Sequence, residues 1–134
     1  MYVNIRIRMK FYIIIPAHNE AQFIGLTLES LVNQSLLPSK IIVVDDNSTD
    51  ETAAIVRNYA EKHDFISLVT KQSDAIHLPG SKVIQAFQEG LKHVDQSYDS
   101  IAKFDADLIF PSNYIETIIK HFDSDEKIGM VGGF

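Results

Sequence analysis

Two aspartates one residue apart, Asp105 and Asp107, directly follow a short apolar run at 101–104. Paired carboxylates at the end of a strand suit a hard divalent cation such as Mg²⁺ or Mn²⁺, which takes a few protein oxygens and completes its shell with water and substrate phosphates. A structural use is the alternative, with Asp107 capping a helix and Asp105 forming a turn. A second Asp-x-Asp triplet, at 123–125, lies in a polar stretch after a helical pattern, and we interpret it as solvated surface.

Two further polar segments follow apolar runs, residues 16–20 and 45–48, and they carry Glu20 and Asp46. In open parallel α/β sheets, ligands bind outside the carboxyl ends of the strands, where the strand-to-helix loops gather. We therefore expect these acids and the Asp105/Asp107 pair to lie on the same edge of one sheet.

These residues must be positioned by the strands and helices around them. Along the chain, short apolar runs typical of strands alternate with segments whose apolar residues follow the helical period, which predicts an α/β domain with a mostly parallel sheet. The run Ile41 to Val44 is typical of a central strand covered on both faces. Strands are predicted at 11–15 (ended by Pro16), 41–44 (ended by Asp45 and Asp46), 65–70, 101–104 and 128–131.

Helices are predicted at 20–34, after 48–51, from 80–81 onward and after Pro111. Asn19 is the predicted N-cap of the first helix, and Ser48 to Glu51 reads as a capping box for the second. The predicted buried faces of the last two helices comprise Ile84, Phe87, Leu91 and Val94, then Ile115, Ile118, Ile119 and Phe122. Phe23 and Tyr59 are also expected in or beside the core.

The chain has 134 residues, 12 basic and 18 acidic side chains, a formal charge of −6 and no cysteine. Three of the basic residues lie in the first ten positions, so the rest of the chain is still more acidic. This charge argues against nucleic-acid binding through a basic surface. The lack of cysteine excludes disulfides, thiolate metal sites and cysteine nucleophiles and is compatible with the cytosol.

Residues 1–10 lack the apolar segment of a secretory signal, and we interpret them as an N-terminal extension or edge strand ahead of one domain at 11–134. Either Met1 or Met9 could be the native start. The longest apolar run, 11–17, is far below the roughly 20 residues of a membrane-spanning helix.

Three segments together resemble a known family: 13–20 (Ile-Ile-Ile-Pro-Ala-His-Asn-Glu), 43–50 (Val-Val-Asp-Asp-Asn-Ser-Thr-Asp) and 104–107 (Phe-Asp-Ala-Asp). In this order and spacing they look like the signatures of family 2 glycosyltransferases, a resemblance covering roughly residues 11–133. The resemblance implies the Rossmann-like GT-A fold of nucleotide-diphospho-sugar transferases, a nucleotide-sugar donor, Mg²⁺ or Mn²⁺, and inversion at the anomeric carbon.

The resemblance also implies roles for individual residues. The expected nucleotide-binding residues are Pro16, Ala17, Glu20, Asp46, Lys82 and Asp105, with Asp46 facing the base; the expected metal ligands are Asp107 and Asp105. The family's general base comes from a segment after the fifth strand, so we expect it after Phe134 and interpret the chain as C-terminally truncated.

The expected function is therefore metal-dependent, inverting transfer of a sugar from a nucleotide-diphosphate sugar, with UDP-sugar favoured, to an unidentified acceptor hydroxyl in cell-surface polysaccharide or glycolipid synthesis. The expected location is the cytoplasm, including peripheral association with the cytoplasmic face of the membrane. Two alternatives remain: a truncated nucleotide-binding domain without turnover, and a nucleotidylyltransferase. The latter should carry a glycine-rich basic loop after the first strand, and residues 16–20 contain no glycine, lysine or arginine.

Overall fold

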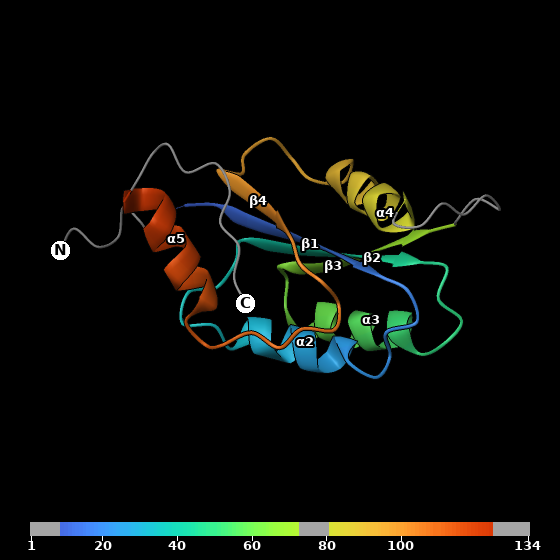
Figure 1. Ribbon diagram of the computed structural model, residues 1–134. Helices are drawn as coiled ribbons and strands as arrows, with labels where there is room; N and C mark the ends of the chain where they lie inside the picture. Colours follow the sequence, from blue (N-terminus) through green and yellow to red (C-terminus); the bar gives the residue numbers. More distant parts are fainter. Residues whose placement is uncertain (1–8, 73–80, 125–134) are drawn as a thin grey trace.

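The computed structural model describes residues 9–72 and 81–124, which form three layers with a parallel sheet in the middle and helices on both sides (Figure 1). The strand order is β3-β2-β1-β4, and every described strand pairing is parallel, as predicted. The strands are β1 (Phe11–Ala17), β2 (Lys40–Asp46), β3 (Ile66–Lys71) and β4 (Ser100–Lys103). The helices are α2 (Ile24–Val32), α3 (Thr52–Lys62), α4 (Ser81–Leu91) and α5 (Tyr114–Ser124).

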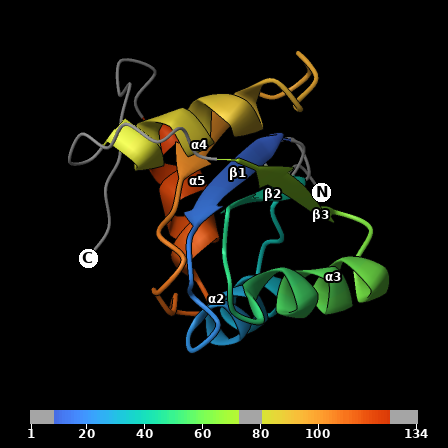
Figure 2. The ribbon, with the colours of Figure 1, turned by 90° about the vertical axis from the view of Figure 1, so that its right-hand side faces the viewer.

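The helices cover the two faces of the sheet unequally. Figure 2 shows α4 on one face and α2 and α3 on the other. Successive strand residues point to opposite faces, so Ile13 and Ile15 pack in the core with α2, α3 and α5, while Ile14 packs in a smaller core under α4. All three are completely buried, as are Ile41, Val43 and Val44 of β2, which explains the continuous apolar runs at 11–15 and 41–44.

The close approach of α4 to the sheet depends on Gly90. A Cβ atom at this position would lie 2.7 Å from Cγ2 of Ile14 and 3.1 Å from Cγ2 of Val44. The missing side chain lets the end of the helix backbone pack directly on β1 and β2.

Two strand ends differ from the predictions. The second strand does not stop before Asp45 and Asp46 but includes both, because they pair with Ala17 of β1 and Lys71 of β3. Pro16 lies inside β1 rather than ending it. The carbonyl of Ile14 faces the β4 side of the strand, because it accepts the N–H of Phe104. The nitrogen of Pro16, two residues further on, faces the same side but lies beyond the end of β4, so the missing N–H costs no strand hydrogen bond.

The helix starts and two apolar faces also differ. The first helix begins at Ile24, because residues 21–23 form a turn in which the amides of Phe23 and Ile24 bond to the carbonyl of Glu20. Phe23 is 39% exposed and Ile84 is 59% exposed, so their predicted burial is wrong. Phe87, Leu91 and Val94 pack against the core under α4, and Ile115, Ile118, Ile119 and Phe122 against the larger one, as predicted.

The last helix begins at Tyr114, with the Pro111 carbonyl accepting its first turn bond. Residues 1–8 and the predicted strand at 128–131 lie outside the described residues. Within the described ranges, no helix combines the length and apolarity required to cross a bilayer.

Candidate functional site

A cavity of about 420 Å³ opens at the carboxyl edge of the sheet. It is bounded by the carboxyl ends of β1 and β2, by the loops that follow β1 and β4, and by the first turns of α4. Its lining residues are Pro16, Ala17, His18, Glu20, Asp46, Lys82, Val83, Ala86, Asp105, Ala106 and Asp107. The structure thus brings all seven residues that were predicted from the sequence onto one surface, from segments separated by up to about ninety positions.

The loop after β1 (residues 18–23, the first loop) is joined to the loop after β2 (residues 47–51, the second loop). Asn19 donates its backbone N–H to Oγ of Ser48 over 2.8 Å, and its side-chain Oδ1 accepts the N–H of Thr49 over 2.8 Å. Asn19 has φ of 52°, in the left-handed region that asparagine tolerates better than most residues. The two loops therefore form one hydrogen-bonded unit.

Asp50 extends this connection toward the acid of the first loop. Its Oδ2 accepts the N–H of Ala21 over 3.1 Å, and its Oδ1 accepts the N–H of Thr52 over 2.9 Å. Thr52, fully buried, accepts the N–H of Glu20 over 2.9 Å. The hydrogen bonds that the carboxylate of Asp50 accepts lower the pKa of Asp50 below its ordinary value. The bond from the Thr52 side chain has the largest effect.

These contacts overturn two predictions about helix caps. Asn19 is not the N-cap of the first helix, and Ser48 and Glu51 do not form a capping box, because the N-cap residues are Phe23 and Glu51 and neither makes a side-chain cap hydrogen bond. Both Asn19 and Ser48 bond across the loops instead. The polar residues were correctly placed near helix starts, but their partners belong to the neighbouring strand's loop, which no local pattern identifies.

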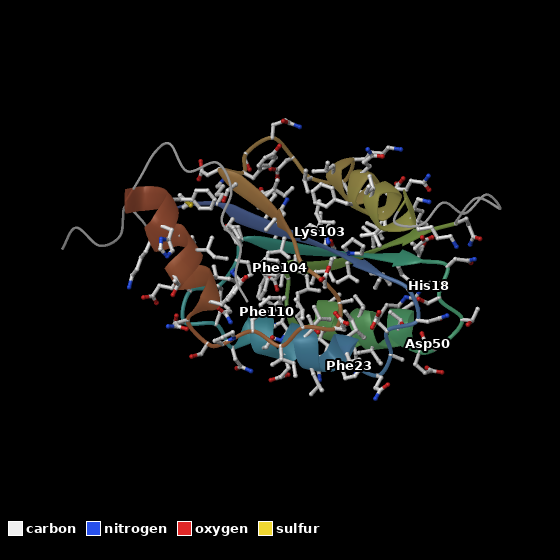
Figure 3. The ribbon with its side chains drawn as sticks, viewed as in Figure 1. His18, Phe23, Asp50, Lys103, Phe104 and Phe110 are labelled. Carbon is white, nitrogen blue, oxygen red and sulfur yellow. The ribbon has the colours of Figure 1, made fainter. Side chains whose placement is uncertain are left out.

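His18 and Asp46 join the same unit at the cavity wall. Nδ1 of His18 lies 2.7 Å from the backbone carbonyl of Asp46, a separation at which the protonated nitrogen donates. Asp46 is 4% exposed and sits at the end of β2, so its carboxylate occupies a fixed place in the cavity lining. Figure 3 shows His18 and Asp50 at the same end of the sheet.

The segment between β4 and α5 (residues 104–113, the acidic loop) is anchored by aromatic rings. Phe104 and Phe110 stack with ring centroids 4.6 Å apart, and Figure 3 shows both between the sheet and α2. Tyr114 packs against both rings. Because these buried rings bracket Asp105 and Asp107, the acid pair lies on a loop closed at both ends.

Three polar side chains of the α2 segment also hold the acidic loop, and the sequence patterns did not identify them. They are Thr27, Ser30 and Gln34, which bond to backbone groups of Ala106, Phe110, Pro111 and Ile115. Their spacing of three and four residues puts them on one stripe of the helix, beside the apolar stripe. That spacing was readable from the sequence, but its partner was not.

The cavity is strongly acidic. Burial raises the pKa of Glu20 first, and the charges of Asp107 and Asp50 raise it further. Lys103 donates to Oδ1 of Asp105 over 3.0 Å and partly offsets that charge. Lys82, on the first turn of α4, is the lysine among the residues that line the cavity.

The donor set fits a divalent cation that shares its shell with a ligand. Across 9–72 and 81–124 no group of three or more histidine or acidic side chains is arranged to hold a metal alone. Mg²⁺ and Mn²⁺ are commonly bound through one or two carboxylates plus substrate phosphates, and Asp105 and Asp107 provide those two on the cavity wall. An acidic cavity that repels an anion also needs a cation before it can accept a diphosphate.

A parallel sheet with acids from three strand ends around one cavity places this chain among the open α/β proteins that bind a ligand at the carboxyl edge of the sheet. Residues 12–134 match the model of the family described as glycosyl transferase family 2. The chain belongs to this family.

The relatives that this chain matches in sequence are longer than the chain itself. It is 35% identical over 133 residues to the probable glycosyltransferase YdaM of Bacillus subtilis (strain 168), covering 97% of this chain and 30% of the relative. It is 27% identical over 122 residues to the poly-beta-1,6-N-acetyl-D-glucosamine synthase of Staphylococcus epidermidis, covering 90% of this chain and 27% of that enzyme. The chain therefore spans about three tenths of the length of these relatives.

Solved structures share the fold. TarS of S. aureus superposes with a TM-score of 0.67 at 28% identity, over 87% of this chain and 20% of TarS. A complex of TarS residues 1–349 with UDP gives a TM-score of 0.64 at 27% identity, over 87% and 32% of the two chains. The mannosyltransferase PcManGT of Pyrobaculum calidifontis, in complex with GDP-Man and Mn²⁺, gives 0.60 at 26% identity, over 84% and 31%.

Proposed function

We propose that this chain forms the donor-binding part of an inverting, metal-dependent glycosyltransferase that moves a sugar from a nucleotide-diphosphate sugar, UDP-sugar favoured, to an acceptor hydroxyl. The observation that carries the proposal is a cavity in which acids from the ends of three strands, Glu20, Asp46 and the Asp105/Asp107 pair, meet the first turn of α4. The UDP complex of TarS and the GDP-Man and Mn²⁺ complex of PcManGT support a nucleotide and a metal as ligands.

The proposed roles follow from where each side chain lies. Asp46 is buried at the end of β2, so its carboxylate can accept an N–H of the base without losing further hydration. Pro16, Ala17 and Glu20 also line the cavity and would contact the nucleoside, with Glu20 held by its backbone bond to Thr52. Lys82 lies on the first turn of α4, where its charge and the helix N-terminus both favour phosphate.

Asp107 and Asp105 would hold the Mg²⁺ or Mn²⁺ ion. When bound, the cation offsets the negative charge that develops on the diphosphate leaving group. The two aspartates would keep the cation in one place, because their loop is closed by stacked rings and bonded to α2. Among the described residues we assign no general base for the acceptor hydroxyl.

Titration calorimetry with UDP tests this proposal. We expect UDP to bind in the presence of Mn²⁺ and to bind at least about tenfold more weakly after chelation. The folded state is checked by far-UV circular dichroism in both buffers. If none of UDP, GDP and dTDP binds to the folded chain with Mn²⁺ or Mg²⁺, the proposal is refuted.

Turnover separates the proposal from a nucleotide-binding domain without activity. Donor hydrolysis and sugar transfer are compared for this chain and for one extended to the length of its relatives. Transfer only by the extended chain supports a donor-binding role for residues 11–134, whereas binding without transfer in both supports the inactive domain. A nucleotidylyltransferase is disfavoured because the first loop has neither glycine nor a basic side chain for a nucleotide triphosphate.

The biological setting we propose is synthesis of a cell-surface polysaccharide or glycolipid, on the cytoplasmic side and in peripheral contact with the membrane. The named relative that makes poly-beta-1,6-N-acetyl-D-glucosamine supports the product class, and a chain without cysteine fits a reducing compartment. Fractionation of native cells tests the location. Recovery of the protein from the outer side of the cytoplasmic membrane would contradict the proposed location.

A further inference from the structure

The hydroxyl of Thr27 contacts the acidic loop between its two aspartates. Oγ1 of Thr27 donates to the carbonyl of Ala106 over 2.9 Å, and Thr27 is completely buried. A threonine hydroxyl in a helix commonly bonds back to the preceding turn of its own helix. Here it bonds to a segment 79 residues away, so the bond is a tertiary contact that joins α2 to the acidic loop.

Ala106 is the fixed point of the Asp105-Ala106-Asp107 triplet. Its side chain belongs to the larger core and is 4% exposed, while both neighbouring aspartates are exposed at the cavity. With its Cβ packed in the core and its carbonyl bonded to Thr27, the residue has little freedom to rotate. Ala106 therefore constrains the backbone from which Asp105 and Asp107 project.

The next turns of the α2 segment continue the same attachment. Oγ of Ser30 accepts the N–H of Phe110 over 3.1 Å, and Oε1 of Gln34 accepts the N–H of Ile115 over 2.9 Å. These bonds hold the far end of the acidic loop and the start of α5. Thr27 differs from them because its partner lies inside the triplet.

We propose that Thr27 is a positioning residue that fixes the acid pair for the cation and diphosphate through the carbonyl of Ala106. The inference rests on the proposed function, because it assigns a task to a residue that supports the same site. Outer partners of metal ligands commonly change metal affinity about tenfold or more when removed. A buried bond to the backbone between two ligands is such a partner.

The variant Thr27→Val tests the role, because valine keeps the shape of threonine and removes only the hydroxyl. We expect the Mn²⁺-dependent UDP affinity to fall about tenfold. The metal-free UDP affinity should stay within about twofold, since the base-facing residues lie on other loops. Thr27→Ser, which keeps the hydroxyl, should restore most of the Mn²⁺ dependence.

Ile24→Val is the matched control. It removes one methylene from a fully buried position on the same helix and costs about as much stability, but it has no bond to the acidic loop. If Ile24→Val loses as much Mn²⁺ dependence as Thr27→Val, or if Thr27→Ser restores none of it, the effect is one of helix packing and the proposal is overturned.

A measurement without ligand separates this proposal from the proposed function. Amide hydrogen exchange should be at least about fivefold faster at 105–110 in Thr27→Val than in Ile24→Val, with similar rates in β1 and β2. Equal exchange at 105–110 in the two variants overturns the positioning role whether or not UDP binds. Faster local exchange in a chain that binds no nucleotide would support the contact and refute only the function assigned to the cavity.

Discussion

Replacing Asn19 should reveal how strongly the two loops at the cavity depend on each other. Asn19→Ala removes the acceptor for the Thr49 N–H, worth about 1 kcal/mol, and leaves a residue with a Cβ but no local hydrogen bond at φ of 52°, which adds about 1 kcal/mol. We expect the free energy of unfolding to fall by about 2 kcal/mol. Asn19→Gly loses the same bond but tolerates the positive φ, so its loss should be about 1 kcal/mol.

Urea unfolding followed by far-UV circular dichroism gives these free energies, and the chain's five tyrosines, without tryptophan, give a second probe. Gln22→Ala serves as a control, since Gln22 is an exposed residue of the same loop. The variant Asn19→Asp keeps both the acceptor and the tolerance for positive φ and should stay close to the wild type. Equal destabilisation by alanine and glycine would refute the backbone contribution, and no loss in either would refute the role of the bond between the loops.

Three further predictions concern the site and the packing beneath it. Asp107→Asn should abolish the Mn²⁺-dependent part of UDP affinity in calorimetry while changing the melting temperature by less than about 3 °C, because Asp107 is exposed; unchanged Mn²⁺ dependence would contradict its assignment as a ligand. The raised pKa of Glu20 means that the folded state disfavours its ionised form, so this residue costs stability as pH rises from below its ordinary value of 4.5 through the raised value. Glu20→Gln cannot ionise and should be more stable than the wild type at pH 7 but not at pH 3.5, as measured by urea midpoints; a lower midpoint at pH 7 would contradict the sign. Gly90→Ala should destabilise by about 1 to 2 kcal/mol in urea, because the added Cβ would lie 2.7 Å from Ile14, whereas the exposed neighbour changed in Gln88→Ala should have little effect.

The fold followed from periodicity wherever a segment's own burial determined its pattern. β1 and β2 are covered on both faces, so their continuous β-branched runs predicted central parallel strands. The stripe of Ile115, Ile118 and Ile119 likewise predicted the buried face of α5. Ile84 shows the limit of the method, because a helical stripe predicts an apolar face but not how far along the helix the neighbouring layer reaches.

The four candidate acids were found because strand ends in a parallel sheet meet at one edge, a rule that needs no knowledge of side-chain contacts. Pro16, Ala17 and Lys82 were expected from the resemblance to the family's motifs. The structure brings them onto one cavity, and their individual roles stay predictions. The supporting residues could not be found in this way. Asn19, Ser48 and Thr27 each looked like an ordinary helix or cap residue, since the local pattern carries no information about a partner in another loop.

By itself, the sequence determined which segments form strands and helices and which acids stand at strand ends, because hydrophobic period and strand-terminal polarity are local properties of the chain. Only the tertiary structure decided which polar groups bond to one another: Asn19 to the second loop and Thr27 to the carbonyl between the two aspartates. The physical reason is that a donor or acceptor takes the partner that folding brings within about 3 Å, and that partner can lie anywhere in the chain.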